Sequence, residues 1–316
     1  MSKPTILVTG AGGQIGTVLS ESLRRRYGRD QVIATDIRPT SQPNGIFEQL
    51  DIMDRDRLSQ LIQDYKITQI YHLVAILSAN GEKDPLRTWK INMDSLFNIL
   101  EAARVHKIDR IFFPSSIATF GPNAPAFNTP QFSYLDPTTV YGISKVAAEN
   151  WCNYYYSKYG LDIRSLRYPG IISYQSEAGG GTTDYAVDIF HEALDKGSFS
   201  CFLNANTKLP MIYMEDAVRA TMELMECSSE QIKIRTSYNL AGLSFTPEEI
   251  ADEIKKHIPD FTIEYNPDFR QAIADSWPAS IDDSSARKDW GWKPAFDLQK
   301  MTSEMLAQLK NKRQLT

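Results

Sequence analysis

Short apolar stretches rich in β-branched and aromatic residues alternate, along the first half of the chain, with longer segments whose apolar residues recur every three or four positions. The short stretches predict buried strands, and the longer segments predict helices. Strands are expected at residues 5–9, 31–36, 69–73, 110–114 and 162–167, and helices at residues 14–27, 55–65, 85–106 and 140–159. This alternation is typical of a doubly wound parallel sheet with helices on both faces.

The alternation stops near Pro169, and shorter helical segments predominate beyond it. Three glycines interrupt the chain at residues 179–181, and Thr246 followed by Pro247 and Glu249 is typical of a helix start. We therefore expect an α/β fold in which residues 1–170 form the doubly wound domain. Residues 171–316 would form mainly a smaller α/β substrate domain, with segments near 210–240 returning to the first.

The bulk composition argues against several classes of function. A net charge of −5 gives the chain no basic surface for nucleic acid. No apolar run approaches the roughly 20 residues that span a bilayer, so no membrane association is expected. Three cysteines without a CxxC pair favour a reducing, cytoplasmic environment over a disulfide framework. The four histidines are scattered, so no metal is expected.

A glycine-rich loop separates the first predicted strand from the first predicted helix. Gly10 permits a tight turn, Gly13 allows a pyrophosphate to approach the backbone, and Gly16 allows close packing of helix and strand. The helix N-terminus behind the loop offers free N–H groups to phosphates. An ordinary Gly-rich turn is the alternative, but the flanking strand and helix favour the dinucleotide-binding loop of a Rossmann fold.

Two acidic positions follow the next strands. Asp36 ends the second strand, where a carboxylate can accept both ribose hydroxyls and would repel a 2′-phosphate. We therefore expect NAD rather than NADP, although Arg38 is of a type that can host that phosphate. Asp51 and Ile52 follow a further short strand ahead of the helix at 55–65, at a position where such an aspartate either faces the adenine or forms a turn or helix cap.

Tyr141 and Lys145 lie four residues apart, on one face of a predicted helix. A free tyrosine has a pKa near ~10, which a neighbouring ammonium group and the nicotinamide ring would lower. Tyr141 could then take a proton from a substrate hydroxyl while hydride leaves the same carbon. Ser116 lies at the end of the strand that begins at residue 110, at the ligand-binding edge of such a sheet, and could hold the substrate oxygen. A surface helix pair is the alternative reading of the Tyr–Lys spacing.

Together these motifs resemble the extended short-chain dehydrogenase/reductase family. The matching parts are the glycine loop, Asp36, residues 51–52, Asn92 and residues 114–121, 141–145 and 167–170. The resemblance implies an NAD-dependent oxidoreductase whose catalytic residues are Ser116, Tyr141 and Lys145. It also implies cofactor contacts from Gly10, Gly13, Gln14, Ile15, Gly16, Asp36, Asp51, Ile52, Leu73, Ala75, Asn92, Tyr141, Lys145 and Ile171.

Within this family the chain is most similar to the short-chain threonine dehydrogenases, on residues 168–173, 179–186, 211–214 and 277–283. The likeness implies oxidation of the L-threonine 3-hydroxyl to 2-amino-3-oxobutanoate, in a homodimer formed through the helices at 85–106 and 140–159. Substrate contacts are implied at Ser78, Ser116, Tyr141, Thr182, Thr183 and Trp277. The glycines at 179–181 could equally be a flexible connector, and Trp277 could be a core residue.

Two other functions fit parts of the pattern. A nucleotide-sugar epimerase or dehydratase shares the fold, but such dehydratases carry an acidic pair where this chain has Ile117 and Ala118. Epimerases usually have an asparagine where this chain has Tyr168 and Pro169. A non-catalytic NAD-sensing regulator would keep the glycine loop and lose the catalytic tyrosine or lysine, and both are present.

Overall fold

The computed structural model describes residues 3–40, 44–175 and 181–314, so positions 179 and 180 of the glycine run lie outside the described residues. The main sheet has seven strands, each parallel to its neighbours, in the order β10-β6-β5-β4-β1-β2-β3. Their bounds are β1 Ile6–Thr9, β2 Val32–Asp36, β3 Phe47–Gln49, β4 Gln69–His72, β5 Arg110–Ser116, β6 Ile163–Tyr168 and β10 Tyr238–Asn239. The expected doubly wound α/β fold is confirmed.

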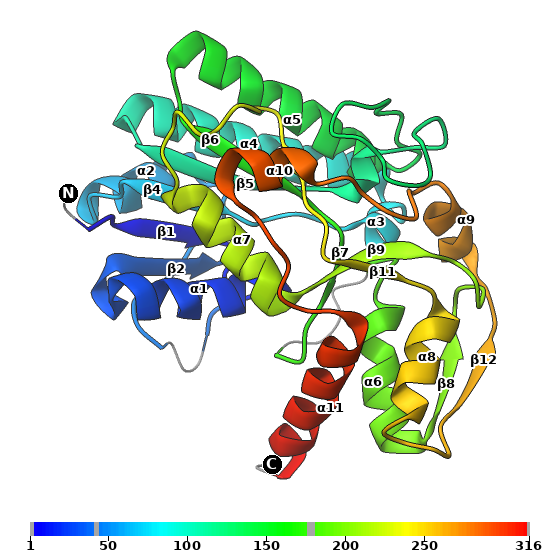
Figure 1. The fold of residues 1–316 in the computed structure, drawn as a ribbon. Helices are drawn as coiled ribbons and strands as arrows, with labels where there is room; N and C mark the ends of the chain where they lie inside the picture. Colours follow the sequence, from blue (N-terminus) through cyan, green and yellow to red (C-terminus); the bar gives the residue numbers. More distant parts are fainter. Residues whose placement is uncertain (1–2, 41–43, 176–180, 315–316) are drawn as a thin grey trace.

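Helices cover both faces of this sheet (Figure 1). On one face α1 (Gln14–Tyr27) packs against α7 (Met214–Glu226), and on the other α4 (Pro85–His106) packs against both α2 (Arg55–Asp64) and α5 (Val140–Tyr159). Each helix buries an apolar stripe against the strands, which is why residue periodicity located these helices in the sequence.

A few observed boundaries differ from the expected ones. The second strand begins at Val32 rather than at residue 31, because the 3₁₀ turn η1 (Arg29–Gln31) precedes it. The strand expected at 110–114, β5, continues past Pro114 to Ser116, because β6 pairs with it as far as Ser116. This extension carries Ser116 on the strand itself, at the carboxyl edge of the sheet.

A smaller body of structure packs around a second core (Figure 1, lower right). It contains α6 (Tyr185–Lys196), α8 (Pro247–Lys255), α11 (Leu298–Gln314) and the parallel pair β8 (Ser198–Cys201) and β12 (Thr262–Tyr265). The expected helix start at Thr246 is confirmed by reciprocal hydrogen bonds with Glu249 of 3.1 and 2.8 Å. Short elements complete the fold: β7 Gly170–Ile172, β9 Leu209–Tyr213, β11 Leu243–Phe245, α3 Ser78–Gly81, η2 Ile117–Thr119, α9 Phe269–Asp275 and α10 Ser284–Trp290.

Segments late in the sequence return to the main sheet. Helix α7 covers α1, and β10 adds a strand beside β6. A further return, which was not predicted from the sequence, is α10. Its Trp290 joins the core of the main sheet together with Trp292, which follows the helix. The two bodies are therefore interleaved along the chain.

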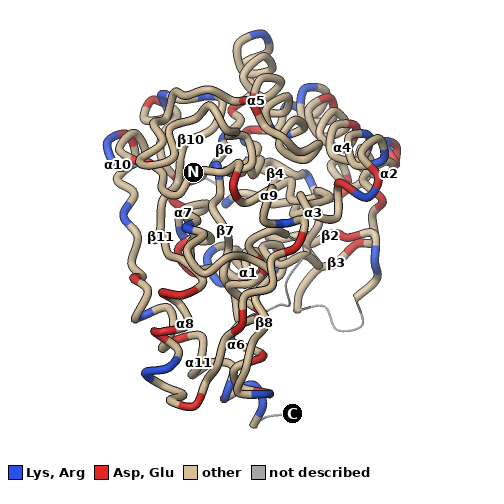
Figure 2. The backbone as a smooth tube through the Cα atoms, turned by 90° about the vertical axis from the view of Figure 1, so that its right-hand side faces the viewer, with Lys and Arg blue, Asp and Glu red and all other residues tan. Residues whose placement is uncertain are grey.

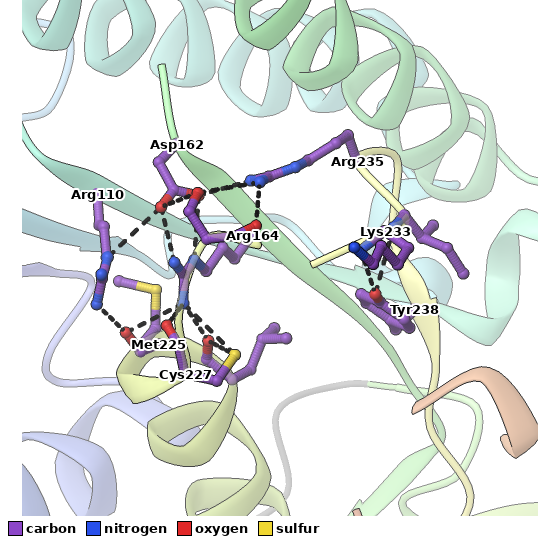
Figure 3. Close-up of polar contacts among 11 residues, drawn as sticks. Arg110, Asp162, Arg164, Met225, Cys227, Lys233, Arg235 and Tyr238 are labelled. Atoms are coloured by element: carbon purple, nitrogen blue, oxygen red, sulfur yellow. Dashed lines mark hydrogen bonds and ion pairs between the residues drawn. The ribbon is translucent and has the colours of Figure 1, made fainter. Parts of the chain in front are cut away.

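An arginine cluster fastens α7 to the amino edge of the main sheet (Figure 3). The side chain of Arg164 is fully buried and donates to Asp162 at 2.7 Å and to the carbonyls of Leu224 and Cys227 at 2.6 and 2.8 Å. Asp162 also pairs with Arg235 at 2.6 Å. Cations at the carbonyl end of a helix are favourable, so this cluster stabilises the junction of α7 and β6.

Along the described chain, Lys and Arg segments are interspersed with Asp and Glu segments (Figure 2). Across the part of the chain that the structure describes, no helix has both the length and the apolar character needed to cross a membrane.

Candidate active site

The sheet order reverses between β1 and β4, and their carboxyl ends therefore flank a crevice. Crossover connections leave β1 toward one face of the sheet and β4 toward the other, which makes this point the usual ligand site of a doubly wound fold. The glycine loop follows β1, and residues 73–78 follow β4. Both loops open onto the same edge.

The glycine loop has the backbone that a dinucleotide-binding turn requires. Gly10 has a φ of +73°, a conformation that side-chain-bearing residues rarely adopt. A Cβ atom on Gly16 would overlap the carbonyl oxygen of Gly10, so only glycine fits where α1 crosses the turn. Gly13 caps α1 without a side-chain hydrogen bond, and no acidic residue lies in the first turn of that helix. The N–H groups of this helix end can therefore bind phosphate.

Asp36 lies at the carboxyl end of β2 and faces the glycine loop. One carboxylate oxygen accepts from the Gly12 N–H at 3.0 Å, and the other accepts from the Arg38 N–H at 3.1 Å. The Arg38 side chain also pairs with Asp36, with Nε 3.5 Å from the carboxylate. Arg38, the residue that could host a 2′-phosphate, is thus paired with Asp36, whose carboxylate would repel such a phosphate.

Tyr141 lies in the first turn of α5, which Thr139 caps by accepting from the Gly142 N–H at 3.1 Å. The tyrosine is buried, with 9% of its surface exposed, and its side chain is hydrogen-bonded to that of Ser116 at the end of β5. Burial raises the pKa of Tyr141 to about 12, and the Ser116 hydrogen bond opposes that rise. The lowered pKa that the Tyr–Lys spacing predicted is not found, because desolvation of the Tyr141 side chain dominates.

Lys145 lies one turn along α5 from Tyr141 and is 3% exposed. Its ammonium nitrogen donates to the Pro114 carbonyl at 2.6 Å and lies 5.5 Å from the centroid of the Tyr141 ring. Burial lowers the pKa of Lys145 to about 7. Because both side chains are buried, the alternative of a surface helix pair is wrong.

A cavity of about 130 Å³ joins these groups to the smaller body. Ser116, Tyr141 and Lys145 line it together with Ser78 of α3 and with Thr182 and Thr183, which precede α6. Ser78 and Thr182 are hydrogen-bonded at 3.2 Å across 104 residues of sequence. Other expected site residues in its wall are Gln14, Ile15, Leu73, Ala75, Ile171 and Trp277. Trp277 also packs against the second core, so it lines the cavity as well as being a packing residue. Its contact with a substrate stays a prediction.

Besides the three glycines of the loop after β1, four expected site residues lie outside this cavity wall and have structural partners. Asn92 accepts from the Ile76 N–H at 2.8 Å and donates to the Ile76 carbonyl at 3.1 Å, which fixes the loop after β4. Asp51 accepts from the Met53 N–H at 2.9 Å, so it forms a turn, which was one of the two roles expected for it. Ile52 is buried in the core, and Asp36 lies beside the glycine loop. Contacts of these residues with a cofactor stay a prediction.

The structure also brings to the cavity residues that were not selected from the sequence. Asp184 lines the wall and accepts from the Gly181 N–H at 2.7 Å. Its position directly after the Thr182–Thr183 pair was the available signal. Ser115 lines the wall as well, and Glu149 binds its hydroxyl at 2.5 Å. A glutamate four residues after Lys145 was visible in the sequence, but a solvated helix face explains such spacing equally well.

The model of the NAD dependent epimerase/dehydratase family matches residues 6–241 of this chain. The chain belongs to this family. The match spans the glycine loop, Ser116, Tyr141 and Lys145, and it confirms the resemblance to extended short-chain dehydrogenases. Among curated members, an uncharacterised epimerase/dehydratase of Staphylococcus haemolyticus is 47% identical over 314 residues, 98% of each chain.

Among solved structures, this chain is similar to L-threonine dehydrogenases. The holo form of a GalE-like L-threonine dehydrogenase from Cupriavidus necator is 53% identical, with a TM-score of 0.95 over 97% of this chain and 100% of that one. A monomeric L-threonine 3-dehydrogenase from metagenomic sequence is 47% identical, with a TM-score of 0.95 over 97% of this chain and 99% of that one.

Proposed function

We propose that this protein oxidises the 3-hydroxyl of L-threonine to 2-amino-3-oxobutanoate and that NAD accepts the hydride. The observation that carries the proposal is the single cavity in which Tyr141, Ser116 and Lys145 meet the hydroxyl groups of Ser78 and Thr182. The similarity to two L-threonine dehydrogenases, which are 53% and 47% identical to this chain over 97% of its length, supports the same substrate.

The chain has the features needed to hold NAD. The uncapped N–H groups of α1 would bind the pyrophosphate, because no side chain competes for them. Asp36 would accept the ribose hydroxyls and exclude a 2′-phosphate. When bound, the cofactor supplies the hydride acceptor beside the substrate carbon and a positive ring beside Tyr141.

Tyr141 is the base in this proposal. The substrate loses a hydride from C3 and a proton from the 3-hydroxyl, and the phenolate oxygen of Tyr141 receives that proton. Ser116 donates to the same substrate oxygen and keeps it in line with Tyr141. Lys145 lies 5.5 Å from the ring centroid, and its ammonium form would stabilise the phenolate. The products are the 3-ketone and NADH, which balances the two electrons and the proton.

The substrate carboxylate and ammonium groups would be held where the two bodies meet. Ser78 and the threonine pair 182–183 contribute hydroxyl groups there, and Ser78 already bonds Thr182 at 3.2 Å. These hydroxyl groups lie in the wall of the same cavity as Ser116 and Tyr141, so a small polar substrate held there would have its hydroxyl beside the proposed base.

Initial-rate measurements of NADH formation test the proposal. L-Threonine should be oxidised. L-allo-Threonine, which is inverted at C3, and D-threonine, which is inverted at both C2 and C3, should react about a hundredfold more slowly, because each loses at least one of the required alignments. Thr182→Ala should raise the KM for L-threonine more than it raises the Kd for NAD.

Two outcomes would contradict the substrate assignment. Conversion of a UDP-sugar, with no NADH formed from L-threonine between mildly acidic and alkaline pH, would favour the epimerase or dehydratase alternative. NAD binding without turnover of either substrate would favour a regulatory role.

We also propose a cytoplasmic homodimer. Large apolar side chains are exposed on the outer faces of α4 and α5, namely Leu86, Trp89, Ile143, Trp151 and Tyr154. Contiguous exposed apolar surface is typical of an interface. One relative is named as monomeric, so the solution mass decides the matter, and light scattering that gives 35.8 kDa would contradict the dimer.

A further inference from the structure

A buried ion pair lies directly behind the proposed catalytic residues. Glu149 of α5 binds Arg167 of β6 through two hydrogen bonds of 2.9 and 2.7 Å. The two side chains are 1% and 4% exposed. Removing two charges from water is costly, and such a pair often adds little to stability compared with apolar residues of the same size. The pair is therefore a candidate for a role beyond stability.

The pair is connected to the site on one side and to distant segments on the other. Glu149 accepts from the Ser115 hydroxyl at 2.5 Å, and Ser115 is the neighbour of Ser116 on β5. On the far side, Arg167 donates to the Gln131 carbonyl at 3.0 Å and to Asn239 of β10 at 3.1 Å. One network thus ties β5, α5, β6 and β10 at the same edge of the sheet.

Glu149 also belongs to the helix face that carries the proposed base. Tyr141, Lys145 and Glu149 follow one another at four-residue intervals, so they lie on one side of α5. Lys145 binds the Pro114 carbonyl of β5, and Glu149 binds Ser115 on the same strand. Two successive turns of α5 are therefore fastened to the strand that carries Ser116.

We propose that Glu149 and Arg167 form a positioning pair that sets α5 against β5 and so holds Tyr141 and Lys145 in register with Ser116. This inference rests on the proposed function for its turnover measurements. Neither residue touches the reacting atoms in this assignment, because Glu149 acts through Ser115 and Lys145. The pair also places a negative charge one helical turn behind Lys145.

The charges around Lys145 give the pair a measurable signature. Burial lowers the pKa of Lys145, while Cys152 and Glu149 oppose that effect. His72, which faces it from β4, has a pKa lowered to about 3 by burial and is neutral. Among the described residues, the titratable groups that interact with Lys145 are Tyr141, Glu149 and Cys152 on α5 and His72 on β4, and Glu149 is in turn paired with Arg167 on β6. Glu149 is the negative charge among them, and a nearby negative charge favours the protonated form of both Lys145 and Tyr141. Its removal should therefore lower the pKa of each group.

The Glu149→Gln variant of the full chain tests the pair. The amide keeps the size of the side chain and an oxygen for Ser115 but removes the charge. We expect kcat for L-threonine oxidation to fall about tenfold to a hundredfold, with little change in KM or in the Kd for NAD. The apparent pKa of the rate profile, which belongs to the coupled Tyr141–Lys145 pair, should move about 0.5 to 1 unit lower.

Asp162→Asn is the matched control, because Asp162 pairs with buried Arg164 at the opposite edge of the sheet (Figure 3). This variant should lose thermal stability while kcat and the pH profile stay unchanged. If Glu149→Gln behaves like the control, the pair has a structural role alone and the proposal is overturned. If Glu149→Gln does not fold, the double variant Glu149→Gln/Arg167→Met leaves no unpaired charge and should still show the loss of kcat and a downward shift.

A second readout does not depend on the substrate. The tyrosinate absorbance of Tyr141, taken as the difference from Tyr141→Phe, can be titrated in the NAD-bound protein. A lower midpoint in Glu149→Gln supports the pair even if L-threonine is not the substrate, and an unchanged midpoint overturns it. Absence of NADH formation by the wild-type protein would instead contradict the proposed function alone.

Discussion

Replacement of Tyr141 by Phe removes one hydroxyl group and little else. The ring is 9% exposed and keeps its place in the first turn of α5, so its packing is retained. The lost interaction is the hydrogen bond with Ser116, and one such bond contributes about 1 kcal/mol to the free energy of unfolding. Loss of a general base lowers kcat about 10²- to 10⁴-fold, which corresponds to about 3 to 5 kcal/mol in the activation barrier.

The assay compares NADH formation from L-threonine with the Kd for NAD and the melting temperature of both proteins. Turnover should fall by the factor above while the Kd and the melting temperature change little. The sign of the pH dependence follows from the raised pKa of Tyr141: the base is protonated at neutral pH, so the wild-type rate should increase as pH rises. The residual rate of Tyr141→Phe should lack this increase. Turnover within tenfold of wild type would refute the assignment of Tyr141 as the base.

Two further variants test the cofactor and the buried lysine. Asp36→Ala removes the carboxylate that accepts from the Gly12 and Arg38 N–H groups. The ratio of kcat/KM for NAD to that for NADP should fall about 10- to 100-fold, which is the worth of one charge-assisted hydrogen bond to the ribose. An unchanged ratio would show that Asp36 does not contact the ribose. Burial lowers the pKa of Lys145 to about 7, below its unfolded value of ~10.4. Between these pH values the unfolded chain binds more protons, so the stability of the wild-type protein should rise with pH. In urea unfolding, Lys145→Met should be more stable than wild type at pH 7 and lose that advantage toward pH 10; a difference that does not change with pH would contradict the lowered pKa.

Several parts of the fold were determined by local sequence. The helices at 14–27, 85–106 and 140–159 have the predicted bounds, because their apolar period and their capping residues are read within one segment. The glycine loop was predicted for the same reason, since the backbone of Gly10 and the packing of Gly16 depend on neighbours a few residues away.

Tertiary structure decided which distant groups meet. Ser78 and Thr182 are 104 residues apart, and Glu149 finds Arg167 on a strand that follows α5. No local pattern predicts such pairs, because each depends on how two elements pack. The packing of Trp290 in the core of the main sheet was not predicted for the same reason.

The protonation of the site is also a property of the folded state. Spacing alone suggested that Lys145 would lower the pKa of Tyr141, but both groups are buried together and desolvation dominates each of them. The cost of removing a charge from water depends on everything that surrounds the side chain, which no segment of sequence contains. The residues of the reaction were therefore found in the sequence, and their electrostatic state was set by the fold.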